Sequence, residues 1–194
     1  MIILIILIMT LSVCLVKLYK LQKNSITDFL TDLYNRRHLE DILDQEIGRA
    51  SRYKHELIVM FVDLDKFKII NDTLGHKVGD KVLRNVAKNL KKSTRPFDFI
   101  ARPGGDEFIV LLPETSLESA KYVGNKLIQA IEAIPIENTS LTLSASIGIC
   151  QFDPEDSSLD LIKEADEAMY EAKNGGRGRI HISPKSLKFL SGQT

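Results

Sequence analysis

The sequence predicts an α+β domain with a mainly antiparallel central sheet flanked by helices. Residues 57–62 form a continuous apolar and β-branched run, which is typical of a buried strand. Residues 97–101 and 108–112 predict two further strands, joined through a Gly-Gly turn into a β-hairpin. Helical patterns lie between the strands without a regular β-α-β repeat, so a wholly parallel sheet is not expected.

Each remaining element follows from its hydrophobic spacing. Leu39, Ile42, Leu43 and Ile47 recur at helical intervals, which predicts a helix from Asn35 to about Tyr53. Apolar residues later in the chain recur at the same helical intervals, and each of these helical patterns ends near Gly or charged residues. The further helices are expected at residues 66–72 (ending at Gly75), 78–92, 117–134 and 159–173, and the further strands at 141–150 and 179–182.

Length and composition restrict the class of protein. The chain has 194 residues, enough for one domain of roughly 150 to 160 residues and a short extra segment. Lys and Arg number 26, as do Asp and Glu, so no overall positive field would recruit nucleic acid. Cys14 and Cys150 are too few and too far apart to indicate a disulfide framework or a zinc cluster.

The amino terminus has the composition of a membrane anchor. Residues 1–16 are apolar except for Thr10 and Ser12, and an apolar stretch continuing to residue 21 would span roughly the hydrocarbon thickness of a bilayer. A signal peptide, the alternative, would carry positive charge before the apolar run and small residues at a cleavage site after it. Lys17, Lys20 and Lys23 follow the run instead, so the positive-inside rule places the rest of the chain in the cytoplasm.

These observations divide the chain into four parts. We expect a single transmembrane anchor at residues 1–21, a linker at 22–30, one domain at 31–183 and a tail at 184–194. The expected location is the inner (cytoplasmic) membrane of a bacterium, crossed once, with the domain in the cytoplasm.

Acidic residues cluster where the predicted strands and turns end. Three pairs are candidates to meet at one edge of the sheet: Asp63 with Asp65, Asp106 with Glu107, and Asp72 with Asp80. Carboxylates brought together repel each other unless a divalent cation lies between them, and their hard oxygen atoms suit Mg²⁺. A single Asp-x-Asp is more often a pair of solvated turn residues, but two clusters together favour a metal site.

Basic residues near these acids are candidates to bind phosphates. Lys68 follows the first acidic pair, and Lys173 and Arg177 flank a Gly-Gly turn after the last helix. Lysine and glycine at a helix end also serve as ordinary caps, so the pattern alone leaves both interpretations open.

Taken together, these motifs resemble the GGDEF family of diguanylate cyclases from about residue 27 to 182. The matching segments are DFLTDLYNRR at 28–37, DLDKFKIIND at 63–72, GH at 75–76, GD at 79–80, RPGGDEF at 102–108, SIG at 146–148 and the closing helix from Ala165 to Arg177. The resemblance implies a fold like the palm of nucleotidyl cyclases and polymerases. It also implies that two GTP molecules are condensed to cyclic di-GMP with release of pyrophosphate, by a homodimer because each site holds one GTP.

The resemblance assigns catalytic roles to particular residues. Asp63, the backbone carbonyl of Leu64 and Asp106 would hold Mg²⁺, with Mn²⁺ as an alternative ion. Asp106 would act as the base for the attacking 3′-hydroxyl, with assistance from Glu107. Lys68 would stabilise the transition state of this metal-assisted phosphoryl transfer.

The same resemblance assigns the substrate-binding residues. Asn71 and Asp80 correspond to guanine-reading positions, and His76 lies in the same stretch, although a packed or capping histidine is an equal alternative. Gly104 and Gly105 would let the phosphates approach the hairpin backbone, and Lys173 and Arg177 would bind the terminal phosphates.

Two features concern regulation. Arg95 and Asp98 match an RxxD site at which the product inhibits the enzyme, whereas spacing alone would suggest a surface ion pair. Pro103 departs from the usual hairpin because proline removes a backbone donor and fixes φ.

Two other functions stay open at this point. A catalytically silent module would bind cyclic di-GMP or GTP as a receptor, but it would be expected to lack Asp63, Lys68 or Asp106, and all three are present. A cyclase acting on ATP would use the same metal chemistry and would differ in the base readers Asn71 and Asp80.

Overall fold

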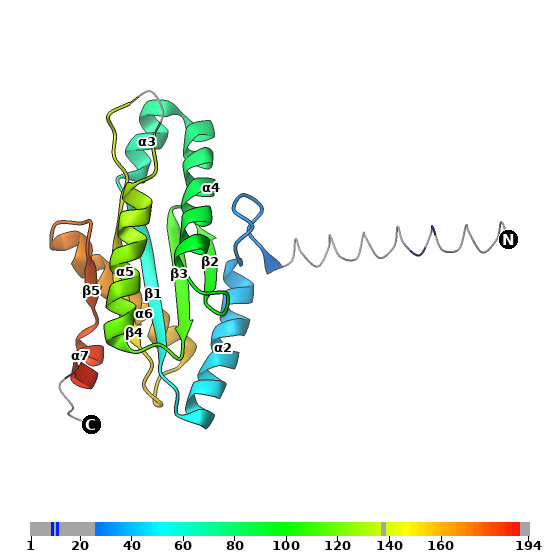
Figure 1. Ribbon diagram of the computed structural model, residues 1–194, viewed down its shortest axis with the longest axis vertical. Helices are drawn as coiled ribbons and strands as arrows, with labels where there is room; N and C mark the ends of the chain where they lie inside the picture. Colours follow the sequence, from blue (N-terminus) through cyan, green and yellow to red (C-terminus); the bar gives the residue numbers. More distant parts are fainter. Residues whose placement is uncertain (1–8, 10, 12–25, 137–138, 191–194) are drawn as a thin grey trace.

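The computed structural model describes residues 9, 11, 26–136 and 139–190 (Figure 1). Its elements in chain order are α2 (Arg36–Tyr53), β1 (Leu57–Asp65), α3 (Phe67–Leu74), α4 (His76–Ser93), β2 (Phe99–Gly104), β3 (Glu107–Pro113), α5 (Leu117–Glu132), β4 (Ser144–Gln151), α6 (Ser158–Asn174), β5 (Ile180–Ile182) and α7 (Pro184–Leu190).

A single five-stranded sheet forms the centre of the domain. Its strand order is β2-β3-β1-β4-β5, and every neighbouring pair is antiparallel except β4 with β5, which is parallel. The predicted α+β fold with a mainly antiparallel sheet is therefore confirmed. In this register Asp63 lies opposite Glu107 on β3 and opposite Ser146 on β4.

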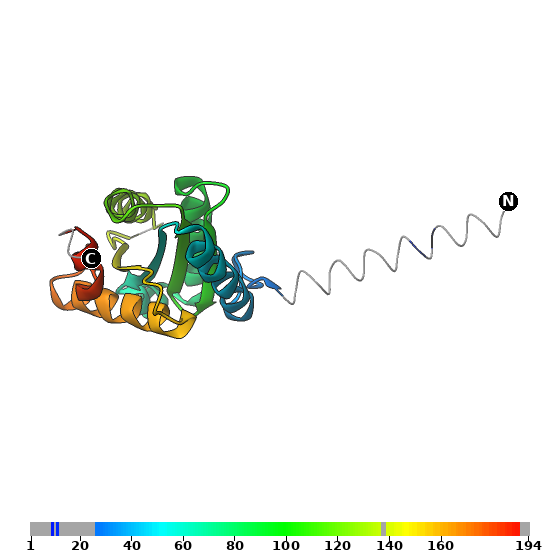
Figure 2. The same ribbon diagram turned by 90° about the horizontal axis from the view of Figure 1, so that it is seen from below.

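Helices cover both faces of this sheet, as the view along it in Figure 2 shows. The side chains of β1 alternate between the two layers, because successive residues of a strand point to opposite faces. Ile58, Met60, Val62 and Leu64 pack with α3, α4 and α5, whereas Leu57, Val59 and Phe61 pack with α2 and α6. By the same alternation Asp63 and Asp65 lie on the α6 face.

Glycine permits the close packing of α6 on the sheet. A Cβ atom at Gly148 of β4 would lie 1.9 Å from the carbonyl oxygen of Ala165 and 2.2 Å from the amide nitrogen of Met169. Backbone atoms cannot yield to such contacts, so this glycine sets the distance between α6 and the carboxylate-bearing strand beside it.

Several boundaries differ from the sequence prediction by a few residues, and two differences are informative. Strand β4 begins at Ser144, three residues later than expected, and α7 lies in the segment predicted as a tail. Helix α7 is attached to the sheet by polar contacts, since the fully buried hydroxyl of Ser186 accepts a hydrogen bond of 2.7 Å from the β4 amide of Gln151. Hydrophobic periodicity does not reveal a helix held in this way.

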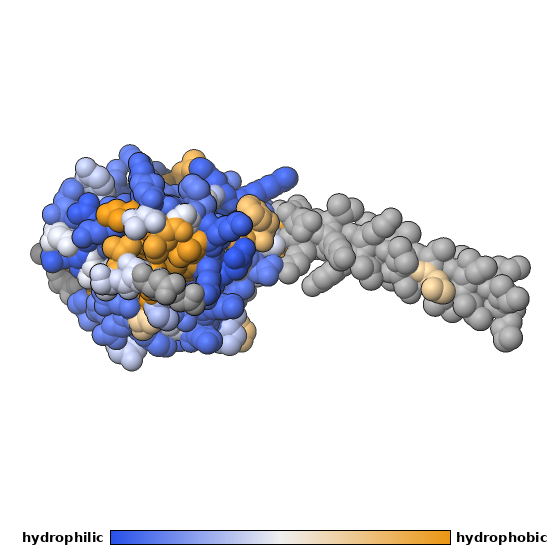
Figure 3. All heavy atoms as spheres, turned by 90° about the horizontal axis from the view of Figure 1, so that it is seen from above, coloured by the Kyte–Doolittle hydropathy of each residue, from blue (hydrophilic) through white to orange (hydrophobic). Residues whose placement is uncertain are grey.

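The predicted transmembrane span lies outside the described residues except for Met9 and Leu11. Within the described part of the chain, no helix has both the length and the apolar character needed to cross a bilayer. Figure 3 looks onto the end of the domain that carries α3 and shows a mainly hydrophilic surface with a hydrophobic patch near its centre and smaller apolar areas toward its edges.

Candidate functional site

A cleft of about 380 Å³ lies between α3, α4 and the β2–β3 hairpin. Six residues predicted as catalytic or substrate-binding line it together with neighbours from the same elements. These six are Lys68, Asn71, His76, Asp80, Gly105 and Asp106. The structure therefore brings together most of the predicted nucleotide segment, and His76 is exposed at the start of α4 rather than packed in the core.

The position of Asn71 depends on a close approach between α3 and α4. A Cβ atom at Gly79 would lie only 1.9 Å from Oδ1 of Asn71. With glycine at this point, the amide of Asn71 rests against the first turns of α4, which also carry Asp80. Both predicted base readers consequently face the same cleft.

The carboxylates at the end of β1 lie beside the tip of the hairpin. The backbone N–H of Leu64 donates a hydrogen bond of 3.2 Å to the carbonyl oxygen of Asp106. Nζ of Lys173, at the end of α6, lies 2.7 Å from Oδ2 of Asp63. Burial raises the pKa of Asp63, Lys173 offsets part of this rise, and the negative charges of Asp106 and Asp65 add to it.

Glu107 and Asp166 enlarge this acidic group. Burial raises the pKa of Glu107, and the charges of Asp63, Asp166 and Asp106 raise it further. Asp166 lies on α6, where burial likewise raises the pKa of its carboxyl group. Sequence reasoning assigned no role to Asp166, because periodicity on α6 does not indicate which acidic residue faces the sheet edge.

The predicted metal ligands are compatible with a hard divalent cation. Asp63, Leu64 and Asp106 supply two carboxylates and one carbonyl oxygen, a set of hard oxygen donors, and the mutual repulsion of the carboxylates is the condition that such an ion relieves. Among the described residues, no group of three or more His, Cys, Asp or Glu side chains is arranged to hold a metal ion. The candidate set combines two carboxylates with a backbone carbonyl oxygen.

A buried arginine fixes the hairpin from the other side. Arg102, only 9% exposed, donates from Nε at 3.0 Å and from Nη2 at 2.6 Å to the carbonyl oxygen of Gly105. Its Nη1 lies 3.0 Å from Oδ1 of Asp28, in the turn that precedes α2. This ion pair connects the start of the domain with the residue next to Asp106.

Comparison with known proteins identifies the family. The sequence profile described as "Diguanylate cyclase, GGDEF domain" matches residues 25–179. The chain belongs to the GGDEF diguanylate cyclase family. This confirms the resemblance seen in the sequence motifs.

Several similar curated proteins are named diguanylate cyclases. The chain is 42% identical over 164 residues to diguanylate cyclase DgcP of Pseudomonas aeruginosa and covers 24% of it, with 84% of the chain aligned. It is 39% identical over 163 residues to diguanylate cyclase DosC of Escherichia coli and covers 35% of it, with 82% of the chain aligned. The chain thus spans about a quarter to a third of these curated relatives.

The fold matches a solved GGDEF structure closely. The coiled coil and GGDEF domain of DgcB from Caulobacter crescentus, solved in complex with c-di-GMP, superposes with a TM-score of 0.84 at 28% identity. The match covers 89% of this chain and 93% of that chain.

The proline in the hairpin of this GGDEF domain occupies a tolerant position. Strand β2 is an edge strand, and its pairing with β3 shifts register between Ala101 and Gly104, where Pro103 lies. Edge strands and bulges are the places where a sheet accommodates proline without losing a central hydrogen bond. The hairpin therefore keeps Gly105 and Asp106 in place despite Pro103.

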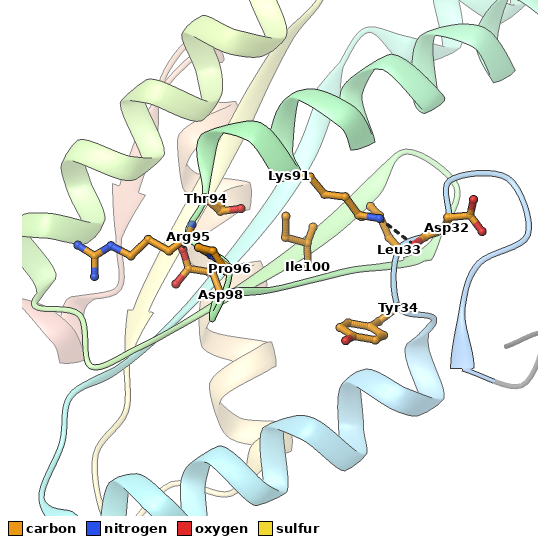
Figure 4. A pocket seen from close by; sticks show the side chains of 9 residues that line it. All are labelled: Asp32, Leu33, Tyr34, Lys91, Thr94, Arg95, Pro96, Asp98 and Ile100. Carbon is orange, nitrogen blue, oxygen red and sulfur yellow. Dashed lines mark hydrogen bonds between the residues drawn. The ribbon is translucent and has the colours of Figure 1, made fainter. Parts of the chain in front are cut away.

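The predicted RxxD residues lie at the opposite end of β2, roughly 20 Å of strand away from the hairpin tip. Asp98 accepts a hydrogen bond of 2.6 Å from the backbone N–H of Arg95, and burial raises the pKa of Asp98. Both residues line a pocket of about 300 Å³ that also includes Tyr34 and Lys91 (Figure 4).

The side chain of Arg95 points away from Tyr34 in this pocket (Figure 4). Arg95 and Asp98 also line an adjoining groove of about 500 Å³, together with Tyr122 and Lys126 of α5. Sequence reasoning missed these α5 residues, because nothing in the spacing of a helix indicates that it borders a strand start elsewhere in the chain.

The remaining predicted residues lie outside the cleft. Lys173 contacts Asp63 and the Arg177 guanidinium lies 3.9 Å from Asp65, both on the α6 side of β1, and Gly104 is exposed beside the hairpin tip. Lys173 and Arg177, the predicted phosphate-binding residues, therefore lie close to the β1 carboxylates. The predicted base readers lie in the cleft, on the other side of this sheet edge.

Proposed function

We propose that the chain is a diguanylate cyclase that condenses two GTP molecules into cyclic di-GMP and pyrophosphate. The observation that carries this proposal is the position of Asp106, which lies beside Asp63 and also lines the cleft with Lys68 and Asn71. Relatives named diguanylate cyclase support it. The silent-receptor alternative is not favoured, because no acidic or basic member of the set has been lost.

The guanine base of GTP would be recognised by Asn71 and Asp80. The amide and carboxylate groups complement the donor and acceptor edge of guanine, and the missing side chain of Gly79 leaves the space that the amide occupies. This arrangement favours GTP over ATP, since the Asp80 carboxylate can accept the two N–H groups that guanine presents on one edge.

The reaction itself requires a base and a charged pocket. Asp106 would accept the proton of the 3′-hydroxyl, whose oxygen forms a bond to the α-phosphorus of the second GTP. The bond from that phosphorus to the bridging oxygen breaks, and pyrophosphate leaves with the electron pair. Lys68 would stabilise the charge that builds on the phosphate. Glu107, which lies opposite Asp63 on β3, would assist Asp106 as the base.

Diguanylate cyclases of this family generally need a divalent metal. We propose Mg²⁺, with Mn²⁺ as an alternative, held by Asp63, the Leu64 carbonyl oxygen and Asp106. When bound, such an ion lowers the pKa of a coordinated hydroxyl and neutralises phosphate charge. Lys173 and Arg177 would bind the terminal phosphates on the α6 side.

The reaction needs two copies of the chain. Each protomer would bind one GTP, so the 3′-hydroxyl from one protomer must meet the α-phosphate held by its partner, as in a two-fold symmetric homodimer. We further propose that the apolar residues 1–21 anchor the protein in the cytoplasmic membrane of a bacterium, with the GGDEF domain in the cytoplasm.

Product feedback through Arg95 and Asp98 completes the proposal. A guanidinium group pairs well with phosphate or with the acceptor edge of guanine, and the pocket and groove on either side of Arg95 leave room for a nucleotide. The similar GGDEF domain of DgcB was solved in complex with c-di-GMP, which supports the choice of product as the ligand.

Product analysis tests this function. The full chain is incubated with GTP and Mg²⁺, and the products are separated by chromatography. We expect cyclic di-GMP and pyrophosphate from the wild type and none from Asp106→Asn, with Asp44→Asn on the exposed face of α2 as the matched control. Tight binding of cyclic di-GMP without turnover, even after forced dimerisation, would instead establish a receptor.

A further inference from the structure

Asp65 is a buried carboxylate that the proposed reaction leaves without a role. It is the last residue of β1 and is only 5% exposed. It lies two residues beyond Asp63, so both side chains are on the α6 face of the sheet. A buried carboxylate needs partners that compensate for its lost hydration.

The partners of Asp65 come from β4 and from the loop after α6. Its Oδ1 accepts a hydrogen bond of 2.8 Å from the hydroxyl of Ser146, which is fully buried. Its Oδ2 accepts a hydrogen bond of 3.0 Å from the backbone N–H of Gly178. Nε of Arg177 lies 3.9 Å from Oδ1.

The loop that Asp65 holds has an unfavourable backbone conformation. Gly176, Arg177 and Gly178 have φ angles of +117°, +63° and +58°. An arginine in the left-handed region costs on the order of 1 kcal/mol and persists only where surrounding contacts hold it. Arg179 holds the loop from outside, since its Nε donates 3.3 Å to the carbonyl oxygen of Arg177.

The two aspartates of β1 therefore contact two neighbouring segments that carry cations, the end of α6 and the loop that follows it. Asp63 pairs with Lys173, and Asp65 fixes the loop that carries Arg177. Arg177 keeps about half of its side chain exposed, at 53%, so its guanidinium group is accessible to a ligand even though its backbone is held.

We infer that Asp65 is a positioning residue for phosphate binding, which holds the Gly176–Gly178 loop so that Arg177 is presented to the terminal phosphates of GTP. This inference rests on the proposed function, because it takes Arg177 to be a phosphate ligand. Asp65 contacts no substrate atom in this scheme and acts only through Gly178 and Arg177.

Nucleotide binding by the full chain tests the inference. The probes are 3′-deoxy-GTP, which lacks the attacking hydroxyl, and GMP, which lacks the terminal phosphates. We expect Asp65→Ala to weaken 3′-deoxy-GTP binding about tenfold, as one charge-assisted contact is lost, and to leave GMP binding unchanged. A general structural defect would weaken both ligands equally, and that result would overturn the inference.

Two further variants separate positioning from direct action. Arg177→Ala should weaken 3′-deoxy-GTP binding to the same extent, and the double variant should be no weaker than either single one, because both changes remove the same contact. Asp65→Asn keeps an acceptor for Gly178 and should restore most of the affinity. Additive losses, or a folded Asp65→Asn as weak as Asp65→Ala, would show that Asp65 acts by another route.

Amide hydrogen exchange supplies a measurement that needs neither nucleotide nor a stable variant. The N–H of Gly178 should exchange slowly in the wild type, because Asp65 accepts its hydrogen bond, and fast exchange would overturn the inference outright. If Gly178 were protected but the wild type bound no GTP, the proposed function would fall, and with it the phosphate role of the loop. If the wild type turned over GTP and only the Asp65 variants failed to follow the expected pattern, the inference alone would fall.

Discussion

The substitution Asp28→Asn tests the ion pair that holds the GGDEF hairpin. The Asp28 carboxylate accepts hydrogen bonds from N and Oγ1 of Thr31 at 2.9 and 2.6 Å, and from Nη1 of Arg102 at 3.0 Å. Asparagine has nearly the shape of a protonated aspartic acid. The substitution therefore removes the charge and leaves the volume of the turn unchanged.

The expected loss of stability follows from these contacts. A hydrogen bond that involves a charged group contributes about 1.5–3 kcal/mol, and removing the charge of Asp28 leaves the buried guanidinium group of Arg102 partly uncompensated. The Asp28 side chain is 14% exposed, so water screens a little of the interaction. We expect the free energy of unfolding to fall by about 2 kcal/mol, which lowers Tm by about 4–8 °C in a domain of this size.

The pH dependence gives a sharper test than the magnitude. Burial alone would raise the pKa of Asp28, but the bonds from Thr31 and Arg102 outweigh it and hold the pKa below the usual 3.8. The stabilisation is therefore complete above the unfolded-state value and is lost as the pH falls through the lower folded-state value. The difference between wild type and Asp28→Asn should be full at pH 7 and should shrink toward zero below 3.8.

Urea denaturation followed by circular dichroism from pH 7 down to pH 3 measures this difference. Asp44→Asn, an exposed acid-to-amide change on α2, is the control and should shift the unfolding midpoint little at any pH. A loss below about 0.5 kcal/mol at pH 7, or one that is equal at pH 3 and pH 7, would refute the importance assigned to the Asp28–Arg102 pair.

Three further outcomes are expected. Gly79→Ala should displace Asn71, since the new Cβ would lie 1.9 Å from its Oδ1, and should raise the KM for GTP at least about tenfold. Gly48→Ala is the control: a Cβ atom at Gly48 would have no atom within 4 Å, so the KM should stay as in the wild type. Burial and the charge of a nearby glutamate raise the pKa of Cys150 to about 12. Iodoacetamide at pH 8 should therefore modify this residue only after unfolding. Mass spectrometry that finds Cys150 modified in the folded protein would contradict its burial. Arg95→Ala should raise the concentration of cyclic di-GMP that half-inhibits turnover by at least about tenfold, and an inhibition curve that overlays the wild type would remove this residue from the product site.

Much of the fold was predictable because its signals are local. The apolar run of β1 and the Gly-Gly hairpin are both read from a few adjacent residues, and the structure contains them where the patterns place them. Helix α7 was not predictable in this way, because buried serine contacts rather than an apolar stripe attach it to β4.

The candidate site shows the same division. Lys68, Asn71, Asp80 and Asp106 belong to motifs, and the structure places all four in one cleft. Asp65 was grouped by sequence with the candidate metal ligands, yet its carboxylate is engaged by Ser146 and Gly178, which are far from it in the chain. Sequence spacing indicates that an acid lies at a strand end, but it does not indicate which distant group approaches that acid.

The turn before α2 contacts β2 and also lines the pocket near the start of that strand. Its residue Tyr34 accepts a hydrogen bond of 2.8 Å from the N–H of Arg102 and donates one of 3.1 Å to the carbonyl oxygen of Ile100. The same turn lines the Arg95 pocket, where Nζ of Lys91 donates 3.0 Å to the carbonyl oxygen of Asp32 (Figure 4). A ligand in that pocket and the guanidinium group that supports the hairpin therefore contact one short segment.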